Sequence, residues 1–173
     1  PVLKDPHDPA GPIRVCGDYK ITVNQAAPLD AYSIPITEDQ LATLAEGERF
    51  TKLDLSQASQ QLELDDESKE YLTVNTHMGL FQPSRLQFGV HSATGIFQRE
   101  MDSRLGRIPF VKVRVDDILI SGRTDEEHLC NLRRVLKVLR DSGLTVRRSK
   151  AFSLLLYFSL KFGRFDCAKM QFD

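Results

Sequence analysis

The stretch from Val111 to Gly122 constrains the fold of this chain more than any other. Valines at every second position alternate with Lys112, Arg114 and Asp116, and an isoleucine-rich run then leads to a glycine. Alternation with a period of two is typical of a β-strand that buries one face, and two such runs around a short polar break form a hairpin. The segment therefore predicts a strand, an acidic turn at Asp116 and Asp117, and a second strand.

Strand and helix patterns also alternate along the rest of the sequence. Thr124 and Glu127 form a capping box, and the apolar spacing after it predicts an amphipathic helix that ends at Gly143. The expected apolar face of this helix comprises Leu129, Leu132, Val135, Leu136 and Leu139. The other predicted elements are strands over 13–23, 50–55, 71–76 and 80–86, a strand or helical turn over 60–64, and helices from Thr37 to Gly47 and over 92–105. This order predicts an α+β fold with a largely antiparallel sheet.

Length and composition indicate a globular domain of ordinary size. The chain has 173 residues, of which 41% are hydrophobic and 27% are charged. No run approaches the roughly 20 apolar residues that cross a bilayer, and the first residues lack a secretory signal, so we expect an intracellular protein, cytoplasmic or nuclear, with no membrane partner. Cys16, Cys130 and Cys167 are far apart, which gives no indication of a disulfide framework or a zinc site.

The two halves of the chain carry opposite charge. Residues 1–86 have 7 Lys and Arg against 14 Asp and Glu, whereas residues 87–173 have 16 against 10. A basic surface that faces phosphate, beside an acidic part that holds metal or contacts protein, would give this asymmetry. Two solvated faces of opposite bias would give it equally well.

Three carboxylates stand where strands are predicted. Asp54 lies inside the strand that starts at Phe50, and Asp116 and Asp117 lie between two β-branched strands. Adjacent acids repel each other, and a divalent cation compensates this charge economically. Mg²⁺ binds through carboxylates, phosphate oxygens and water, and a pair of such ions serves phosphoryl transfer. The alternative is structural, with a polar turn at Asp116 and Asp117 and a capped strand end at Asp54.

At these residues the chain resembles a known family, the reverse transcriptases of gypsy-type long-terminal-repeat retrotransposons, which are related to those of retroviruses. The matching blocks occur in the same order over nearly the whole sequence. They are residues 14–20 with Asn24, residues 50–58, residues 71–79, Phe88-Gly89-Val90, Ser92-Ala93 with Ile96-Phe97-Gln98, residues 115–119, Glu126-Glu127-His128-Leu129, and Ser149-Lys150.

The resemblance implies the palm of a right-hand polymerase, in which helices back an antiparallel sheet, together with part of the fingers. Residues 1–173 would form a single reverse transcriptase domain fragment. Its fingers segments would be about 1–50 and 65–90, and its palm segments about 50–64 and 91–173. The thumb and ribonuclease H regions would lie outside this sequence.

The resemblance also implies the roles of individual residues. Asp54, Asp116 and Asp117 would be catalytic and would hold two Mg²⁺ ions, or Mn²⁺, together with the backbone carbonyl of Leu55. The residues that would bind the nucleotide are Arg14, Leu55, Ser59, Phe88, Gly89 and Gln98. The implied activity is RNA-directed DNA synthesis, in which a primer 3′-hydroxyl attacks a dNTP on an RNA or DNA template.

The implied partners, besides template, primer and dNTP, are the remaining parts of a pol polyprotein: thumb, ribonuclease H and integrase. Such a protein would act in a cytoplasmic particle or in the nucleus.

The sequence departs from the family at positions that affect catalysis. Arg114 stands where the family has an aromatic residue, and alternation would place it on the same face as Asp116, roughly 7 Å away. Ser59 stands where a Tyr or Phe ring blocks the ribose 2′-hydroxyl. Residues 152–158 replace the segment that leads to the primer-gripping hairpin, and they look like an uncovered sheet edge.

Two other functions therefore stay open: an inactive fragment that keeps the fold and at most binds nucleic acid or protein, and a two-metal nuclease. The additional helical acids of a two-metal nuclease are lacking in this sequence.

Overall fold

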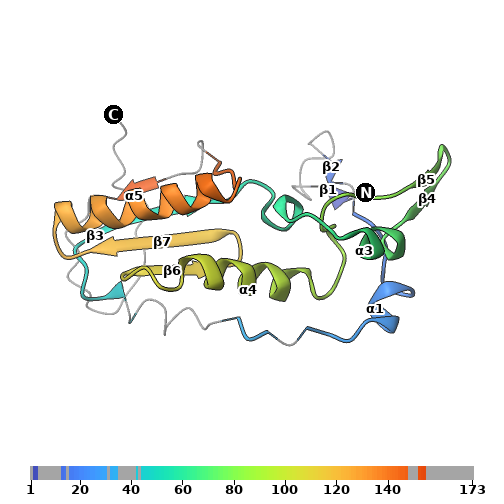
Figure 1. The fold of residues 1–173 in the computed structure, drawn as a ribbon, viewed down its shortest axis with the longest axis horizontal. Helices are drawn as coiled ribbons and strands as arrows, with labels where there is room; N and C mark the ends of the chain where they lie inside the picture. Colours follow the sequence, from blue (N-terminus) through green and yellow to red (C-terminus); the bar gives the residue numbers. More distant parts are fainter. Residues whose placement is uncertain are drawn as a thin grey trace. The chain divides into compact units, whose positions relative to one another are not determined.

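The computed structural model describes residues 2–3, 13–14, 16–30, 32–34, 42, 44–147 and 152–154. By its internal contacts the chain divides into two compact units, residues 1–33 with 57–99 and residues 34–56 with 100–173. We call them unit 1 and unit 2. Figure 1 shows the described helices and strands along the chain. The described elements are β1 (Val2–Leu3), β2 (Ile13–Arg14), α1 (Val23–Ala26), β3 (Arg49–Asp54), the 3₁₀ helix η1 (Ala58–Gln61), α3 (Asp66–Tyr71), β4 (Val74–Thr76), β5 (Gly79–Phe81), α4 (Ala93–Leu105), β6 (Val111–Arg114), β7 (Asp117–Gly122), α5 (Asp125–Asp141) and β8 (Phe152–Leu154).

Unit 2 is built on a four-stranded sheet with the order β6-β7-β3-β8, in which every neighbouring pair is antiparallel. The predicted hairpin is confirmed as β6 and β7. Its alternation sets the buried face, since Val111, Val113, Ile118 and Ile120 are almost completely removed from solvent. The strand predicted over 50–55 is confirmed as β3, which pairs with β7 along its whole length.

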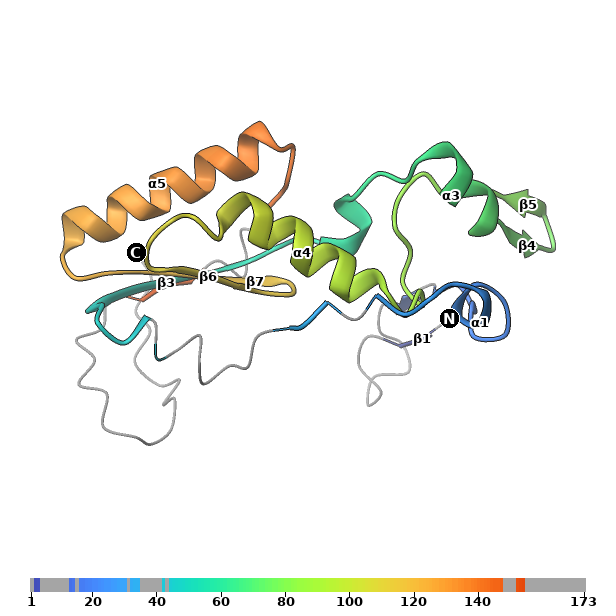
Figure 2. The ribbon, with the colours of Figure 1, turned by 60° about the horizontal axis from the view of Figure 1, so that its bottom comes forward.

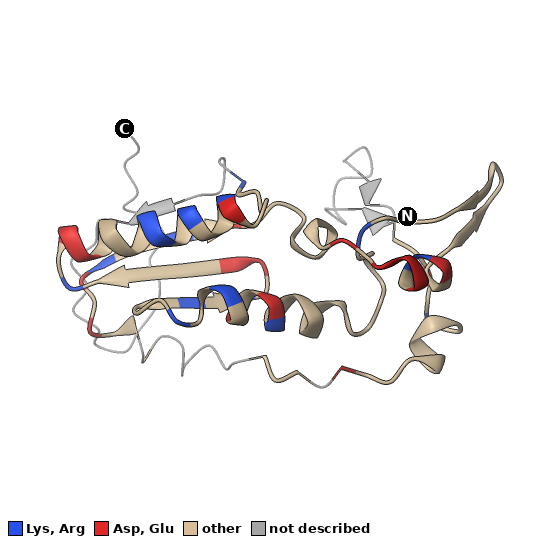
Figure 3. Cartoon of the chain, viewed as in Figure 1, with Lys and Arg blue, Asp and Glu red and all other residues tan. Residues whose placement is uncertain are grey.

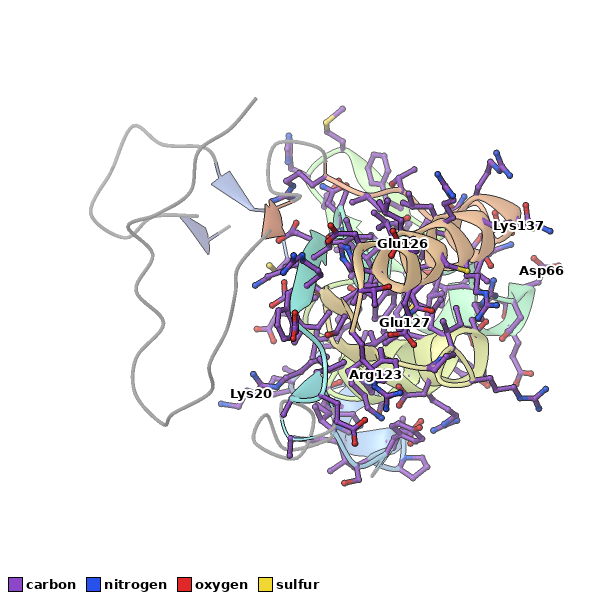
Figure 4. The ribbon with its side chains drawn as sticks, turned by 90° about the vertical axis from the view of Figure 1, so that its left-hand side faces the viewer. Lys20, Asp66, Arg123, Glu126, Glu127 and Lys137 are labelled. Carbon is purple, nitrogen blue, oxygen red and sulfur yellow. The ribbon has the colours of Figure 1, made fainter. Side chains whose placement is uncertain are left out.

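Helix α5 covers one face of this sheet (Figure 2). Its predicted N-terminus is confirmed, because the Thr124 hydroxyl accepts the N–H of Glu127 at 3.2 Å. The Glu127 carboxylate in turn accepts the N–H of Arg123 at 2.7 Å, and both side chains lie at the start of the helix in Figure 4. The predicted end is also confirmed, since Gly143 adopts a φ of 69° directly after the helix, and this conformation favours glycine.

The buried face of α5 differs from the predicted one. It comprises His128, Asn131, Val135 and Leu139, whereas Leu129 and Leu136 are more than 40% exposed. Apolar spacing alone missed the two polar residues because each has a buried hydrogen-bond partner on the sheet. The His128 imidazole Nε2 lies 2.9 Å from the Thr51 hydroxyl, and the Asn131 amide donates to the carbonyl of Ser121 at 3.0 Å.

Unit 1 begins differently from its prediction. The strand predicted over 13–23 is wrong beyond β2, because the chain turns at Tyr19, whose carbonyl accepts the N–H groups of Thr22 and Asn24. Tyr19 is buried and its hydroxyl donates to the carbonyl of Leu72 at 3.1 Å. Burial raises the pKa of this phenol. A tertiary contact thus replaces the expected strand by a turn and the short helix α1.

The next predicted pair of strands is confirmed only as the shorter hairpin of β4 and β5. Tyr71 ends helix α3 instead of starting a strand, since Asp65 caps that helix by accepting the N–H of Ser68 at 2.8 Å. The hydrogen bonds from Ser68 lower the pKa of the exposed Asp65 carboxyl. Pro83 follows β5, and proline cannot donate to a strand ladder. Of residues 60–64, Gln60 and Gln61 belong to η1, which confirms the helical turn for these two, whereas Glu63 forms an isolated antiparallel bridge with Arg85.

The remaining predictions divide into those confirmed and those outside the described residues. The helix predicted over 92–105 is confirmed as α4, and the α+β class with antiparallel sheets is confirmed. Most of the helix predicted from Thr37 lies outside the described residues. The division into fingers and palm segments stays a prediction. Among the residues that the structure describes, no helix has the length and apolar character to cross a bilayer.

Candidate active site at the end of strand β3

The sheet of unit 2 brings the three predicted acids to one end of β3. Asp54, the last residue of β3, is the register partner of Asp117, the first residue of β7. One residue further on, the N–H of Leu55 donates to the carbonyl of Asp116 at 2.8 Å. Register partners on antiparallel strands have Cβ atoms about 5 Å apart on the same face. Antiparallel pairing of β3 with β7 therefore unites acids that are distant in the sequence.

The turn that carries two of these acids has a strained backbone. Val115 and Asp116 connect β6 to β7, and Val115 adopts a φ of 53°. This left-handed conformation is rare for a β-branched residue and costs about 1–3 kcal/mol. The hydrogen bond from Leu55 to Asp116 and the fully buried Ile118 hold the turn in place. Because such strain gathers at functional sites, the turn is the first candidate for one.

The acids of β3 and β7 lie on the sheet face opposite α5. Thr51 and Leu53 are buried on the helix side, so the residues between and after them point the other way. Figure 3 shows acidic residues at the turn between β6 and β7 and basic residues on β6. The residues that the register assigns to this face are Lys112 and Arg114 on β6, Asp117 and Leu119 on β7, and Lys52 and Asp54 on β3.

Two cationic side chains pair with two of the acids. The Lys52 ammonium lies 2.8 Å from the Asp117 carboxylate, diagonally across β3 and β7. On the other side of β3, Arg147 donates its N–H to the carbonyl of Asp54 at 2.8 Å, and its guanidinium Nε lies 3.7 Å from the Asp54 carboxylate. Asp54 and Asp117 are half-buried and Asp116 is exposed.

The prediction for Arg114 continues the alternation of β6 through the acidic turn, which places Arg114 on the face of Asp116. The strand instead ends at Arg114, whose register partner is Asp117. The two-residue turn at Val115 breaks the alternation, and the ion pair of Asp117 in this structure is with Lys52.

The donor set at this end of the sheet suits a divalent cation in its chemistry. Three carboxylates and a nearby backbone carbonyl are the oxygen ligands that Mg²⁺ takes. Among the described residues, however, no three His, Cys, Asp or Glu side chains are arranged to hold a metal ion. Strand pairing therefore brings the backbone positions of the acids together, and the carboxylates of Asp117 and Asp54 are paired with Lys52 and Arg147.

The residues predicted to bind the nucleotide, other than Leu55, belong to unit 1. Ser59 lies in η1 and is half-buried, as is Phe88. Gln98 is completely buried on α4. Arg14 is the last residue of β2, and its side chain lies outside the described residues. The acids lie in unit 2, so each group is described within its own unit.

Gly89 is the predicted pocket residue with the clearest structural requirement. Its φ is 99°, and a Cβ atom there would lie 2.3 Å from the carbonyl oxygen of Gly17. The Asn24 amide donates to the carbonyl of Gly89 at 2.8 Å and accepts the N–H of His91 at 2.9 Å. Only glycine fits this close approach of two backbone segments. Asn24 therefore fixes the loop that carries Phe88 and Gly89.

Sequence reasoning assigned no site role to Lys52 or Arg147. The sequence contains a signal that Lys52 lies near Asp54, since it precedes Asp54 by two residues on a predicted strand and therefore shares its face. Arg147 had none, because its contact with Asp54 depends on the pairing of residues 145–147 beside β3.

This chain is similar to a known family and to known proteins. The family model described as "Reverse transcriptase (RNA-dependent DNA polymerase)" matches residues 6–162. The chain is 36% identical over 141 residues to the uncharacterized protein K02A2.6 of Caenorhabditis elegans, and the match covers 81% of this chain and 11% of that protein. It is 31% identical over 141 residues to the retrovirus-related Pol polyprotein from transposon gypsy of Drosophila melanogaster, covering 79% of this chain and 13% of that protein.

A solved structure gives the same result for the fold. The foamy viral protease-reverse transcriptase in complex with an RNA/DNA hybrid matches with a TM-score of 0.73 and 28% identity, over 81% of this chain and 19% of that one. The predicted resemblance and fold class are confirmed. The chain spans about a tenth of the length of the two curated relatives.

Proposed function

Since this chain belongs to the reverse transcriptase family, we propose that it forms the catalytic part of an RNA-directed DNA polymerase. The observation that supports the proposal most directly is that strand pairing brings Asp54 next to Asp116 and Asp117 at one end of the sheet. In this reaction a primer 3′-hydroxyl attacks the α-phosphate of a dNTP, and pyrophosphate leaves.

The chain's own residues supply a negatively charged platform for this reaction. Asp54, Asp116 and Asp117, with the carbonyl of Leu55, would hold two Mg²⁺ ions, or Mn²⁺. When bound, such ions activate the attacking hydroxyl and stabilise the leaving group. The rigid pairing of β3 with β7 fixes the spacing of the two strand-borne acids, and the turn at Val115 fixes the third.

Residues of unit 1 would bind the nucleotide. The charge and planar fork of Arg14 suit the triphosphate. Phe88 and Gly89 would line the pocket, with Gln98 on the helix behind it. Ser59 would leave room beside the ribose 2′-position. Within this unit, the tight packing of Gly89 against Gly17 supports a pocket wall made by the backbone itself.

The proposed partners are an RNA or DNA template with a primer, a dNTP, and the thumb, ribonuclease H and integrase parts of a pol polyprotein. The foamy viral relative binds an RNA/DNA hybrid, and the gypsy relative is a Pol polyprotein, which supports both proposals. The proposed location is intracellular, in a cytoplasmic particle or in the nucleus.

Primer extension tests the proposal. The 173-residue chain, with an oligo-dT primer on a poly-rA template and Mg²⁺, is expected to incorporate dTTP. An Asp116→Asn variant, purified in the same way, is expected to lose this activity and so excludes a contaminating polymerase. Absence of incorporation by the wild-type chain, or equal incorporation by the variant, contradicts the proposal.

A second function is supported by the ion pairs at the acids. Lys52 and Arg147 already neutralise Asp117 and Asp54, as they would in a fragment that keeps the fold without catalysis. Nucleic-acid binding without primer extension would favour this alternative.

A further inference from the structure

Four cationic positions surround the two strand-borne acids on one sheet face. The register gives Arg114, Asp117 and Asp54 in one row across β6, β7 and β3, and Arg147 lies on the far side of β3. In the next row, Lys112 and Lys52 flank Leu119 from either side, since both are its register partners. Two lysines thus occupy matched positions on this face.

Only one lysine of this matched pair contacts an acid among the described residues. The Lys52 ammonium lies 2.8 Å from the Asp117 carboxylate, although the Lys52 and Asp117 side chains are 46% and 39% exposed. Lys112 lies as near in register to Asp117 but makes no ion pair in the part of the chain that the structure describes. The pair of Lys52 with Asp117 is therefore a specific contact and not a general effect of the basic face.

Backbone hydrogen bonds place Arg147 beside Asp54. Its N–H donates to the Asp54 carbonyl, and the neighbouring Ser56 N–H donates to the carbonyl of Thr145 at 3.1 Å. These bonds fix the Arg147 Cα beside β3, so its guanidinium stays within reach of the Asp54 carboxylate. The Asp54 side chain is only 18% exposed, which strengthens its interaction with a nearby charge.

We propose that Lys52 and Arg147 are internal counter-ions of the acid site, which hold Asp117 and Asp54 in the metal-free protein and lower the affinity of the site for a divalent cation. The inference rests on the proposed function, because it concerns the same acids. A cation can bind only when the two carboxylates exchange their Lys52 and Arg147 contacts for the metal.

The size of the effect follows from the exposure of the pairs. Each partly exposed ion pair of this kind should lower the affinity of its carboxylate for a divalent cation by about two- to fivefold. Asp54 and Asp117 are register partners, so the effects of the two pairs are coupled. We expect the double variant to bind the cation more tightly than either single variant, by up to about tenfold.

The experiment measures Mn²⁺ binding to the 173-residue chain by the loss of the free-ion paramagnetic resonance signal, without nucleotide or template. Lys52→Met, Arg147→Gln and their combination are compared with the wild type. Lys112→Met is the matched control, since it removes the same charge from the same row without removing an ion pair to the acids. Far-ultraviolet circular dichroism of each variant checks that the sheet and α5 are intact.

The expected result is tighter Mn²⁺ binding by Lys52→Met and Arg147→Gln and no comparable change in Lys112→Met. Equal affinity in all proteins, or an equal gain in Lys112→Met, overturns the role of the pairs and leaves the proposed function standing. An Asp54→Asn and Asp117→Asn double variant tests the site itself. If its loss of both acids leaves Mn²⁺ binding unchanged, or if no protein in the series binds Mn²⁺, both the counter-ion role and the proposed metal site are wrong.

Discussion

A buried hydrogen bond connects strand β3 to helix α5, and its removal should destabilise unit 2. The Thr51 hydroxyl on β3 and the His128 imidazole on α5 lie 2.9 Å apart, and the two residues are 3% and 4% exposed. The two substitutions that remove the bond with little change of volume are Thr51→Val and His128→Leu.

The expected magnitudes follow from burial. Each single substitution leaves the partner's buried polar atom without this hydrogen bond, and such a loss costs about 1–3 kcal/mol of unfolding free energy. The double variant removes both polar groups, so its loss should be smaller than the sum of the two single losses by about 1 kcal/mol.

Urea denaturation at pH 7.5 measures all four forms in one cycle. Thr94→Val makes the same chemical change at an exposed position and is expected to change the midpoint little. Strictly additive losses for Thr51→Val and His128→Leu would refute the reasoning, since two groups that bond to each other cannot act independently.

The same histidine predicts a dependence on pH. Burial lowers the pKa of His128, an effect that the nearby Asp125 carboxylate partly offsets. The unfolded chain, with an ordinary pKa of about 6.5, then takes up a proton at a higher pH than the folded chain does. The contribution of His128 to the unfolding free energy should therefore be fully present above pH 7 and be lost as the pH drops below about 6.5. His128→Leu should lose this part of the slope, and an unchanged slope between pH 5 and 7 would contradict the assignment.

Three further substitutions test other parts of the molecule. Gly89→Ala should lower the unfolding free energy by about 2 kcal/mol or more, because a methyl group would collide with the Gly17 carbonyl. Its control is Gly79→Ala, which is also at positive φ but in open space and should cost only about 1 kcal/mol. Thermal denaturation measures both losses. Arg114→Tyr should raise Mg²⁺-dependent primer extension by restoring the ring of the family at the hairpin, and an unchanged rate would rule out Arg114 as an obstacle. Ser59→Tyr should restore exclusion of ribonucleotides, which the ratio of dNTP to rNTP incorporation measures; equal ratios in both forms would exclude a role for this position.

Elements defined by local patterns could be predicted from the sequence. The hairpin of β6 and β7 follows from alternation of valines, and α5 follows from the box of Thr124 and Glu127 and the glycine after its last turn. Each of these signals concerns residues within a few positions of one another. The prediction of the three acids also needed the resemblance to a family, because spacing alone favoured the structural alternative, a polar turn and a capped strand end.

Features that depend on tertiary contacts could not be predicted. Residues 16–22 have strand-like composition, but burial of Tyr19 under Leu72 and the bonds of Asn24 to the loop at Gly89 favour a turn. The buried face of α5 was misassigned because an isolated polar side chain counts as exposed until its partner on the sheet is known. The contact of Arg147 with Asp54 could not be predicted for the same reason, since it depends on how residues 145–147 pair with the end of β3.

The distribution of strain in unit 2 gives an independent reason to place function at the end of β3. Among the described residues of this unit, Phe110 before β6 and Val115 in the acidic turn are the non-glycine residues with a positive φ, at 56° and 53°. Of these two places, the acidic turn is the one that combines this conformation with a β-branched residue and with neighbouring carboxylates. Conflicts of this kind persist where they serve activity, since a stable turn could be made with glycine and neutral residues. The acids and their two counter-ions are thus the part of this sheet that stability alone does not explain.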